Sequence, residues 1–426
     1  MPLSGEETQI TFAATGDSMI SRCISVFEEA NYLNLIKKIR DAEVSFTNLE
    51  MLLHNYEDYY GGKDWTGTYM AARPSMAEEL KWMGFDLVSC ATNHGGDYSY
   101  GGLSSTIRAV SDAGLVCSGA GCNLAQARAP AYLETKKGRV SLVSLTSSFQ
   151  SWERAGEARP DDRGRPGVNG MRCDRVYRVD RNSAKILRAT FERIGAEYHD
   201  TKDGFTALGS HFITSSRVGV RITANKLDVE ANLRSIREAR RQSDWVFMSF
   251  HSHESIGQKE EPADFFEEFA RASIDKGADA VIGHGPHVLR GIEIYRKKPI
   301  FYSLGNFVAQ NETIERLPSD IYEKFGLGWD ATPADVYDAR LGKIPPDDPA
   351  WWETILATGT LKKGKLTCLE LHPVTLRGYL PRSQRGRPFL ATGKEAKKIL
   401  QRLQKMSSVY GTEIEMKGNV AEVRLP

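Results

Sequence analysis

The feature of this sequence that most constrains its fold is an alternation between short apolar runs and longer amphipathic stretches. Apolar or β-branched runs of strand length cover residues 10–15, 44–49, 86–91, 140–145, 245–250, 278–282 and 299–303. Stretches with apolar residues at helical spacing cover residues 28–40, 75–83, 103–113, 229–241 and 263–276. Strands that alternate with helices are typical of α/β domains with layered sheets. We therefore predict an α/β fold.

Two stretches interrupt this alternation. Residues 150–225 are rich in Gly, Pro and Arg, and residues 311–350 carry several prolines and isolated aromatic side chains such as Trp329. Long segments without regular structure inside a compact domain usually form lids or binding loops. We predict one main domain over 8–310, with the first insertion as a lid, and C-terminal elements over 351–426 that complete the same domain.

The C-terminal segment has the pattern of a hairpin followed by a helix. The run TLKKGKLTCLELHPV predicts two strands that turn at Lys363–Gly364, and a helix is expected over 394–406. The sequence contains no internal repeat or low-complexity tract.

Composition and charge exclude several classes of protein. Lys and Arg total 56 against 55 for Asp and Glu, a balance that gives no reason to expect nucleic-acid or membrane-surface binding. The start MPLSGEETQI lacks a secretory signal, and no run reaches the roughly 18–20 apolar residues needed to span a bilayer. The six cysteines form no C-x-x-C pair. We expect reduced thiols and a cytoplasmic location; the sequence leaves the oligomeric state open.

Five short segments place carboxylate, amide or imidazole groups directly after predicted strands. They are ATGDSM with Asp17, TNLE with Asn48 and Glu50, ATNHGGD with Asn93, His94 and Asp97, FHSHE with His251 and His253, and IGHGPH with His284 and His287. Ligands bind at the carboxyl ends of strands in layered α/β sheets. The five segments therefore point to one shared cleft.

Divalent-metal catalysis is the chemistry that needs this set of side chains. Imidazole and carboxylate suit zinc, manganese and iron, and an Asn amide oxygen completes such a site. Two ions about 3.5–4 Å apart can share one carboxylate and one hydroxide, because a bound water becomes acidic near neutral pH. We expect two ions, whose identity among zinc, manganese and iron the sequence leaves open.

Each segment also has a simpler explanation when it is taken alone. An Asp after a strand is often a turn or cap residue, and an Asn-His pair in a Gly-rich turn is common. The hypothesis depends on co-occurrence, because five of the nine histidines lie in three strand-end segments. A rival motif, SGAGCNL, begins like a dinucleotide-binding loop, but Leu124 stands where the third Gly should be.

Taken in order, these segments resemble the CapA family of capsule and poly-γ-glutamate synthesis proteins, a branch of the calcineurin-like metallophosphatase superfamily. The resemblance is carried by ATGDSM, SFTNLE, ATNHGGDYSYGGL, GAGCN, FHSHE and VIGHGPHVLRGIEIYRKKPIFYSLGNFV, and continues in ELHPV and VYGTEIE. It covers about residues 10–415 outside the two insertions. The resemblance implies a four-layer α/β/β/α sandwich with metal ions between the sheet edges.

The resemblance also implies a role for each site residue. Asp17 would bind the first metal and Glu50 would bridge the two. The second metal would be bound by Asn93, His251 and His284, with His287 returning toward the first. His94 would be the acid or transition-state stabiliser, oriented by Asp97. Asn306, in SLGNF, would position a loop near the site or be an ordinary strand-end residue.

Three departures from the wider superfamily affect this assignment. The usual Asp-x-His of the first motif is Asp17-Ser18-Met19, so one ligand of the first metal is missing. Two residues separate His284 from His287, where many phosphoesterases have one. His253 stands where the family commonly has a small residue, which makes it a candidate for an additional ligand or substrate contact.

Two classes of function fit these observations. The first is a hydrolase that uses metal-bound hydroxide on an ester, amide or phosphoester of an anionic substrate, either a small molecule or a short polymer. Arginines of the first insertion would recognise the anion, unless interspersed acids such as Asp161 and Asp174 neutralise them. The second is a non-catalytic component of capsule or poly-γ-glutamate biosynthesis that binds polymer or synthetase partners.

Overall fold

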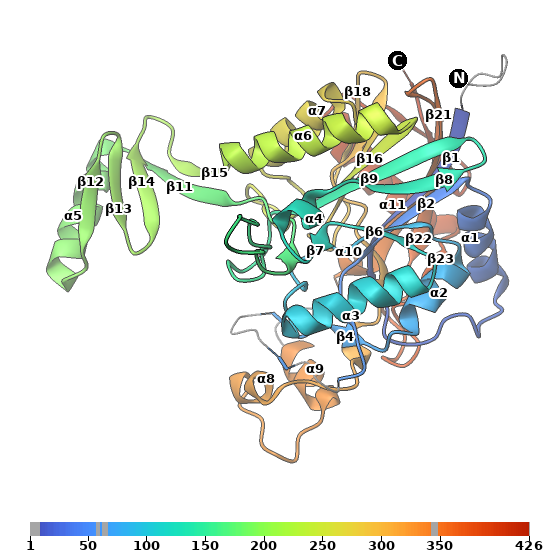
Figure 1. The fold of residues 1–426 in the computed structure, drawn as a ribbon, viewed down its shortest axis with the longest axis horizontal. Helices are drawn as coiled ribbons and strands as arrows, with labels where there is room; N and C mark the ends of the chain where they lie inside the picture. Colours follow the sequence, from blue (N-terminus) through green and yellow to red (C-terminus); the bar gives the residue numbers. More distant parts are fainter. Residues whose placement is uncertain (1–8, 57–59, 62–66, 342–347, 426) are drawn as a thin grey trace.

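The protein has a mixed α/β fold built around two large sheets, with a smaller sheet that projects from the main body (Figure 1). The computed structural model describes residues 9–56, 60–61, 67–341 and 348–425. The α/β class predicted from the alternation of elements is therefore confirmed.

The first sheet joins N-terminal parallel strands to C-terminal antiparallel ones, in the order β24-β25-β22-β21-β1-β2-β5-β6. Its parallel half comprises β1 (Gln9–Met19), β2 (Val44–Leu49), β5 (Leu87–Ser89) and β6 (Val116–Ser118). Its antiparallel half comprises β21 (Glu353–Lys362), β22 (Lys365–Thr375), β24 (Ile414–Lys417) and β25 (Val420–Val423). Two short strands, β20 (Asn306–Ala309) and β23 (Phe389–Leu390), pair with β1 and β22.

The second sheet has the order β18-β19-β17-β16-β9-β8. Its central strands are parallel, namely β9 (Gly138–Thr146), β16 (Trp245–His251), β17 (Ala280–His284) and β19 (Lys298–Phe301). The edge strands β8 (Ala131–Thr135) and β18 (Ile292–Tyr295) run antiparallel to their neighbours. Every position of β16 and β17 is buried. Parallel strands that are buried on both faces are rich in apolar residues, as these two are.

The two sheets share one core. Phe12 and Phe46 of the first sheet pack in the same buried cluster as Phe247 of the second, and the rings of Phe12 and Phe247 are 5.9 Å apart. The apolar face of α11 (Gly393–Ser408) joins this cluster through side chains such as Leu400. Burial of large aromatic side chains between the sheets therefore holds the two halves of the protein together.

Other helices bury their apolar faces against the opposite sides of the sheets. A second cluster packs α1 (Ala30–Arg40) and α2 (Met76–Met83) with strands of the first sheet. A third cluster packs α6 (Lys226–Gln242) and α7 (Asp264–Asp275) with strands of the second. Each helix thus shields one sheet face from water.

All the helices and strands predicted from periodicity overlap observed elements. The C-terminal hairpin turns at Lys363–Gly364 as expected, with both residues at positive φ. The largest shift at a helix start is in α3 (Ser99–Asp112), which begins four residues before the predicted range 103–113. Its first turn contains Gly101 and Gly102, and glycine has a low helix propensity that concealed this turn in the sequence.

The first insertion is not the structureless lid that the sequence suggested. Within it, residues 173–224, which we call the arm, form a five-stranded sheet with the order β12-β13-β14-β11-β15. The strands are β11 (Cys173–Val179), β12 (Tyr198–Thr201), β13 (Gly204–Ala207), β14 (Ser210–Thr214) and β15 (Gly219–Ala224), and α5 (Arg181–Ile194) packs on them. The arm projects away from the two large sheets (Figure 1).

A small aromatic core accounts for the folding of the arm. Phe205 stacks on Phe212 at 4.8 Å between ring centroids, and Phe191 of α5 contacts both rings. Asp180 caps α5 by accepting a hydrogen bond from the backbone of Ser183 at 2.8 Å. Frequent arginines in strands such as β11 hid this pattern, because Arg175 and Arg178 interrupt the apolar alternation that marks a strand.

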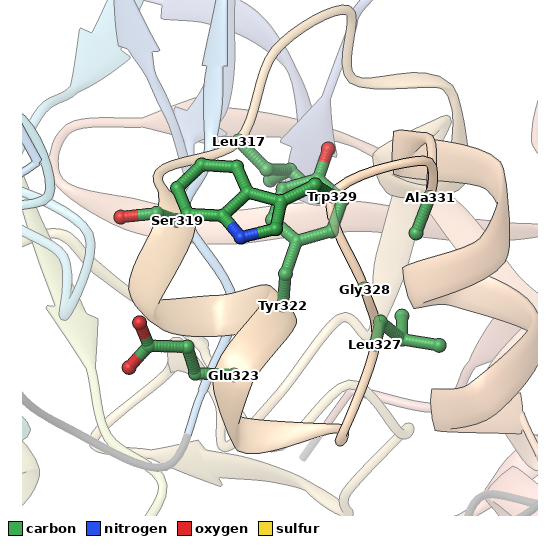
Figure 2. Close-up of a pocket in the computed structure, with 8 residues that line it drawn as sticks. All are labelled: Leu317, Ser319, Tyr322, Glu323, Leu327, Gly328, Trp329 and Ala331. Atoms are coloured by element: carbon green, nitrogen blue, oxygen red, sulfur yellow. The ribbon is translucent and has the colours of Figure 1, made fainter.

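The second insertion contains short helices. They are η1 (Asn311–Thr313), α8 (Ser319–Lys324), α9 (Pro333–Leu341) and α10 (Pro349–Trp352). A pocket of about 330 Å³ lies between α8 and the loop after it, lined by Leu317, Tyr322 and Leu327 (Figure 2). Trp329 borders this pocket and is 99% exposed, so its indole is open to solvent.

His372 of β22 gives the fold a pH-dependent stability. Burial, together with the charge of Lys38, lowers the pKa of His372 to about 4. Its Nε2 lies 2.9 Å from Thr358 Oγ1; the Glu370 carboxylate is 3.5 Å away but partly exposed, so burial dominates. Because the unfolded imidazole has a pKa near 6.5, only the unfolded chain gains this proton as the pH falls from 6.5 to 4.

We therefore expect the free energy of unfolding to be largest above pH 6.5 and to decrease through this window, by up to about 3 kcal/mol from His372. Urea unfolding at pH 7, 5.5 and 4 measures the decrease. The variant His372→Gln should lose stability less steeply than the wild type, while buried histidines such as His284 and His287 maintain the remaining slope. An equally steep decrease in the variant would assign the effect to other groups.

Candidate metal centre

The strand-end segments of both sheets meet at one place. Asp17 lies near the end of β1 and Glu50 directly follows β2, both from the first sheet. His251 and His284 are the last residues of β16 and β17 in the second sheet. All four side chains are fully buried. The carboxyl ends of two sets of parallel strands thus converge, as expected for a binding site in layered sheets.

Six of the predicted ligands form three overlapping groups whose donor atoms lie within 4.8 Å of one another. The groups are Asp17, His251 and His284; Glu50, His251 and His253; and Asp17, Glu50 and His287. Donor atoms that bind one ion at about 2.0–2.2 Å lie within about 4.4 Å of each other, so each group is close to the size of an ion site. Asp17, Glu50 and His251 each belong to two groups, which places the groups side by side.

An irregularity in β1 sets the position of Asp17. The pairing of β1 with β2 shifts between Ala14 and Asp17, and the Asp17 amide donates to Gly305 O at 2.9 Å. A Cβ atom on Gly16 would lie 1.8 Å from the same carbonyl oxygen, so glycine is required at this close approach.

The Asp17 carboxylate is buried and held by two hydrogen bonds. Asn48 Nδ2 donates to its Oδ1 at 2.8 Å, and the Gly285 amide donates to its Oδ2 at 2.9 Å. Burial raises the pKa of Asp17 to about 7 despite these two hydrogen bonds. A bound cation would favour the ionised carboxylate, so this environment fits a metal ligand.

The four imidazoles of the cluster are suited to metal binding because burial keeps them neutral. Burial lowers the pKa of His284 and of His287 to about 3, and it lowers the pKa of His251 and of His253 well below the usual value. A neutral imidazole offers a nitrogen lone pair to a metal. The Nδ1 atoms of His251 and His284 are 3.0 Å apart, and Nε2 of His251 lies 3.1 Å from Nε2 of His253.

His287 is held in a strained backbone conformation. Its φ is 62°, a left-handed value that is uncommon for residues other than glycine. Its Nδ1 lies 2.8 Å from Asn306 Oδ1 and 3.5 Å from Glu50 Oε2. Asn306 in turn donates from Nδ2 to Trp351 O at 3.1 Å, and the Trp351 ring lies 4.5 Å from the His287 ring. Asn306 therefore contacts a predicted ligand and fixes its orientation.

The loop after β5 brings the predicted acid to the cluster. Asn93 Oδ1 lies 2.9 Å from His251 Nε2. The next residue, His94, donates from Nδ1 to Asp97 Oδ2 at 2.6 Å, and the same oxygen accepts the Met70 amide at 2.6 Å. Both His94 and Asp97 are buried. This contact orients the His94 ring, as the predicted pairing requires.

Two contacts of the site were not predicted from the sequence. Ser249 Oγ lies 2.7 Å from His284 Nε2, and Trp351 packs on His287. Ser249 and His251 share one face of β16 because side chains alternate along a strand. Ser249, a polar residue two positions before His251 in an apolar strand, could therefore have been predicted as part of the site. The sequence carried no comparable signal for Trp351, which reaches the site from a distant segment.

The missing ligand of the first motif is replaced by an apolar contact. Met19 is 2% exposed and packs in the core cluster with α1 and α2. No imidazole can therefore come from this position. His253 joins Glu50 and His251 in one of the three groups. The cluster thus has four histidines, all from the second sheet and the loops that follow its strands.

The comparison with known families fits this geometry. A family model described as bacterial capsule synthesis protein PGA_cap matches residues 11–311, a range that contains every predicted ligand. The chain belongs to this family. Among the described residues of this PGA_cap member, no helix is both long and apolar enough to cross a membrane.

Relatives of this PGA_cap member include proteins whose names refer to capsule or PGA biosynthesis. The uncharacterized protein y4uA of Sinorhizobium fredii is 34% identical over 429 residues, covering 97% of this chain and 93% of that protein. The capsule biosynthesis protein CapA of Bacillus anthracis is 24% identical and covers 71% of this chain and 60% of that protein. The PGA biosynthesis protein CapA of Bacillus subtilis is 30% identical over 42% of this chain and 50% of that protein.

Proposed function

We propose that this protein is a metal-dependent hydrolase with a binuclear centre that cleaves an ester, amide or phosphoester bond. The observation that carries the proposal is the overlap of three ligand groups through Asp17, Glu50 and His251. A single structural ion needs one closed set of about four ligands, whereas shared carboxylates are typical of paired catalytic ions.

The ligand set divides naturally between two adjacent ions. Asp17, Glu50 and His251 each belong to two groups and would be the shared residues, and Asn93, His253, His284 and His287 would supply the remaining donors. Ions held there would lower the pKa of bound water and stabilise negative charge that develops on the substrate. Zinc, manganese and iron all accept this combination of oxygen and nitrogen donors.

His94 is the candidate proton donor to the leaving group. Its Nδ1 bonds to Asp97, so Nε2 would be the ring nitrogen that transfers the proton. A carboxylate that accepts from one ring nitrogen fixes the tautomer and direction of the other. The backbone contact from Met70 to Asp97 keeps this pair rigid.

We also propose the four-layer α/β/β/α arrangement of the metallophosphatase type. The shared core between the two large sheets and the helices packed on their other faces support this arrangement. In such an arrangement, the ends of the strands that carry the ligands lie between the two sheets.

A non-catalytic role in capsule or poly-γ-glutamate biosynthesis is the second candidate. The names of the Bacillus relatives, and the replacement of the usual first-motif His by the buried Met19, favour this role. The two roles differ in their need for His94, because a binding protein has no use for an oriented proton donor beside the metal ligands.

Metal content of the purified protein tests the proposal first. Elemental analysis should find close to two divalent ions per chain, and His284→Ala should lower this number because the variant lacks a buried donor. His199→Ala, which changes an exposed histidine on the arm, should keep both ions. One ion in the wild type would indicate a mononuclear mechanism, and no ion after reconstitution would exclude the metal-dependent hydrolase.

A further inference from the structure

A pocket lies at the amino end of a strand that carries a candidate metal ligand at its other end. It has a volume of about 450 Å³, and Trp245, the first residue of β16, lines it. His251 is the last residue of the same strand. Because a strand rises about 3.3 Å per residue, this amino-end pocket lies roughly 20 Å from the metal centre. A ligand bound there would therefore make no contact with the metal centre.

Positive charge dominates the amino-end pocket. The described residues that line it include two carboxylates, Asp244 and Asp279, and five cations. The cations are Arg240, Arg296, Lys298, Lys363 and Lys365. The whole chain, in contrast, has 56 cations against 55 acids, so this excess is local. A concave surface lined by charges of one sign concentrates ligands of the opposite sign.

The buried Asp279 fixes two of these cations in place. Arg240 donates from Nη1 to Asp279 Oδ2 at 2.7 Å, and Lys298 donates from Nζ to Asp279 Oδ1 at 2.8 Å. Asp279 is buried, whereas the side chains of both cations remain partly exposed. One carboxylate balances the charge of only one of the two cations. A positive charge therefore remains on groups that are held by hydrogen bonds.

The other cations come from two hairpin turns of different sheets that lie side by side. Residues 296–297 connect β18 to β19, and residues 363–364 connect β21 to β22. The Leu366 amide donates to Lys297 O at 2.8 Å, which ties the second hairpin to the first. A Cβ atom on Gly364 would lie 3.1 Å from Asp279 Oδ1, so the second turn also packs against the buried carboxylate. The two turns and Asp279 therefore form one continuous surface.

Backbone preference does not account for cations at these turns. The φ angle is 51° at Arg296, 63° at Lys297 and 51° at Lys363, left-handed values that favour Gly or Asn in a two-residue hairpin turn. Residues in such conformations are often found at ligand sites. Arg296 also pairs with Asp275 at 3.0 Å, but its side chain is 66% exposed, and an exposed ion pair contributes little. These turns therefore favour a binding role for their side chains.

The arm is the rival location for anion binding. The exposed cations Arg181 and Lys185 line a pocket of about 500 Å³ on α5. Arg188 and Glu192 line the same pocket, and Arg188 binds Asp200 at 2.8 Å. The excess of positive charge is therefore smaller in the arm pocket than in the amino-end pocket.

We propose that the amino-end pocket is a second binding site, which takes a small ligand with two or more carboxylate or phosphate groups. One such group would bind beside Arg240 and Lys298, and another would bind the cations of the two turns. A guanidinium can bind two oxygens of either group, and the lysines add point charges. The volume is in the range of small-molecule sites. This site does not depend on the proposed hydrolase activity.

Isothermal titration calorimetry with tricarballylate and with ethylenediphosphonate tests this proposal. The first probe offers carboxylates, and the second offers phosphonates that a hydrolase cannot remove. The double variant Arg296→Ala/Lys365→Ala should bind the recognised anion roughly tenfold or more weakly, because hydrogen bonds to charged groups are lost. Arg296→Lys/Lys365→Arg should recover most of the affinity because it keeps both charges. Both positions are exposed, so neither variant opens the core.

Two control variants locate the effect. The double variant Arg181→Ala/Lys185→Ala removes the same number of cations from the arm pocket. It should bind within about twofold of the wild type, because salt screens charges that are far from the ligand. His284→Ala changes the metal centre, roughly 20 Å away along the strands, and should bind the anion as tightly as the wild type.

The remaining outcomes also decide between the alternatives. Binding of one probe alone, with the expected loss in Arg296→Ala/Lys365→Ala, supports the proposal and identifies the anionic group. No binding of either probe to the wild type overturns it. Unchanged affinity in this double variant also overturns it, and a loss in the arm variant or in His284→Ala would then assign the anion to the arm or to the metal centre. Absence of metal from the wild type would refute the hydrolase but leave this test unaffected.

Discussion

The variant Glu50→Gln should lose at least one of the two ions and reduce turnover by more than about 100-fold. Glu50 is fully buried and belongs to two of the three ligand groups, so in the proposed binuclear centre its replacement would remove a shared donor. Changes that only disturb the support of a metal ligand already reduce affinity or activity by roughly 10- to 100-fold. Elemental analysis and a steady-state assay of the reconstituted variant measure the two effects.

A matched control for this variant lies at the other end of the same strand. Glu43 precedes β2 and accepts a hydrogen bond from the Thr11 amide at 2.8 Å, away from the ligand groups. Glu43→Gln should keep both ions and full turnover. If Glu50→Gln also retained two ions and wild-type turnover, the shared-carboxylate centre would be wrong.

The variant His94→Ala should lower kcat by roughly 100- to 10,000-fold while the metal content stays the same. This combination is expected because His94 belongs to none of the ligand groups but is oriented by Asp97 at 2.6 Å beside them. Asp97→Asn should give a smaller decrease in kcat, since the ring remains but its orientation and tautomer are less well fixed. Steady-state kinetics with parallel elemental analysis measures both quantities.

The pH profile separates a proton donor from a merely structural residue. If His94 donates a proton, the limb of the kcat profile at high pH should be present in the wild type and absent in His94→Ala. A loss of metal in His94→Ala, or a profile of unchanged shape, would contradict the assignment and favour the binding role.

Periodicity and strand-end chemistry were enough to predict much of the main body. Apolar runs such as 245–250 and the helical pattern at 229–241 correspond to β16 and α6, because burial against a sheet demands these patterns. The same reasoning grouped Asp17 with His284, residues far apart in sequence whose side chains lie 3.5 Å apart. Parallel strands bring their carboxyl ends to one edge, so a local signal in each strand predicted a shared site.

The arm and the residues that pack beside the candidate ligands were harder to predict for a physical reason. The arm is held by few buried side chains, among them Phe191 and Phe205, so its strands show little of the continuous apolar character of β16. Trp351 of α10 reaches the site through tertiary packing against His287, which leaves no periodic trace in the sequence. Its placement depends on how a whole segment docks rather than on neighbours in the chain.

The candidate ligands come from both large sheets of the molecule. The first sheet supplies the oxygen donors Asp17 and Glu50, and the second sheet supplies the nitrogen donors, among them His251 and His284. Neither half of the molecule holds a complete set, so the centre exists only when the halves have docked in the correct register. Phe46, whose ring lies 6.1 Å from that of His284, sits at this junction. Metal binding would therefore depend on correct docking of the two sheets, because the oxygen and nitrogen donors of a misdocked chain would lie apart.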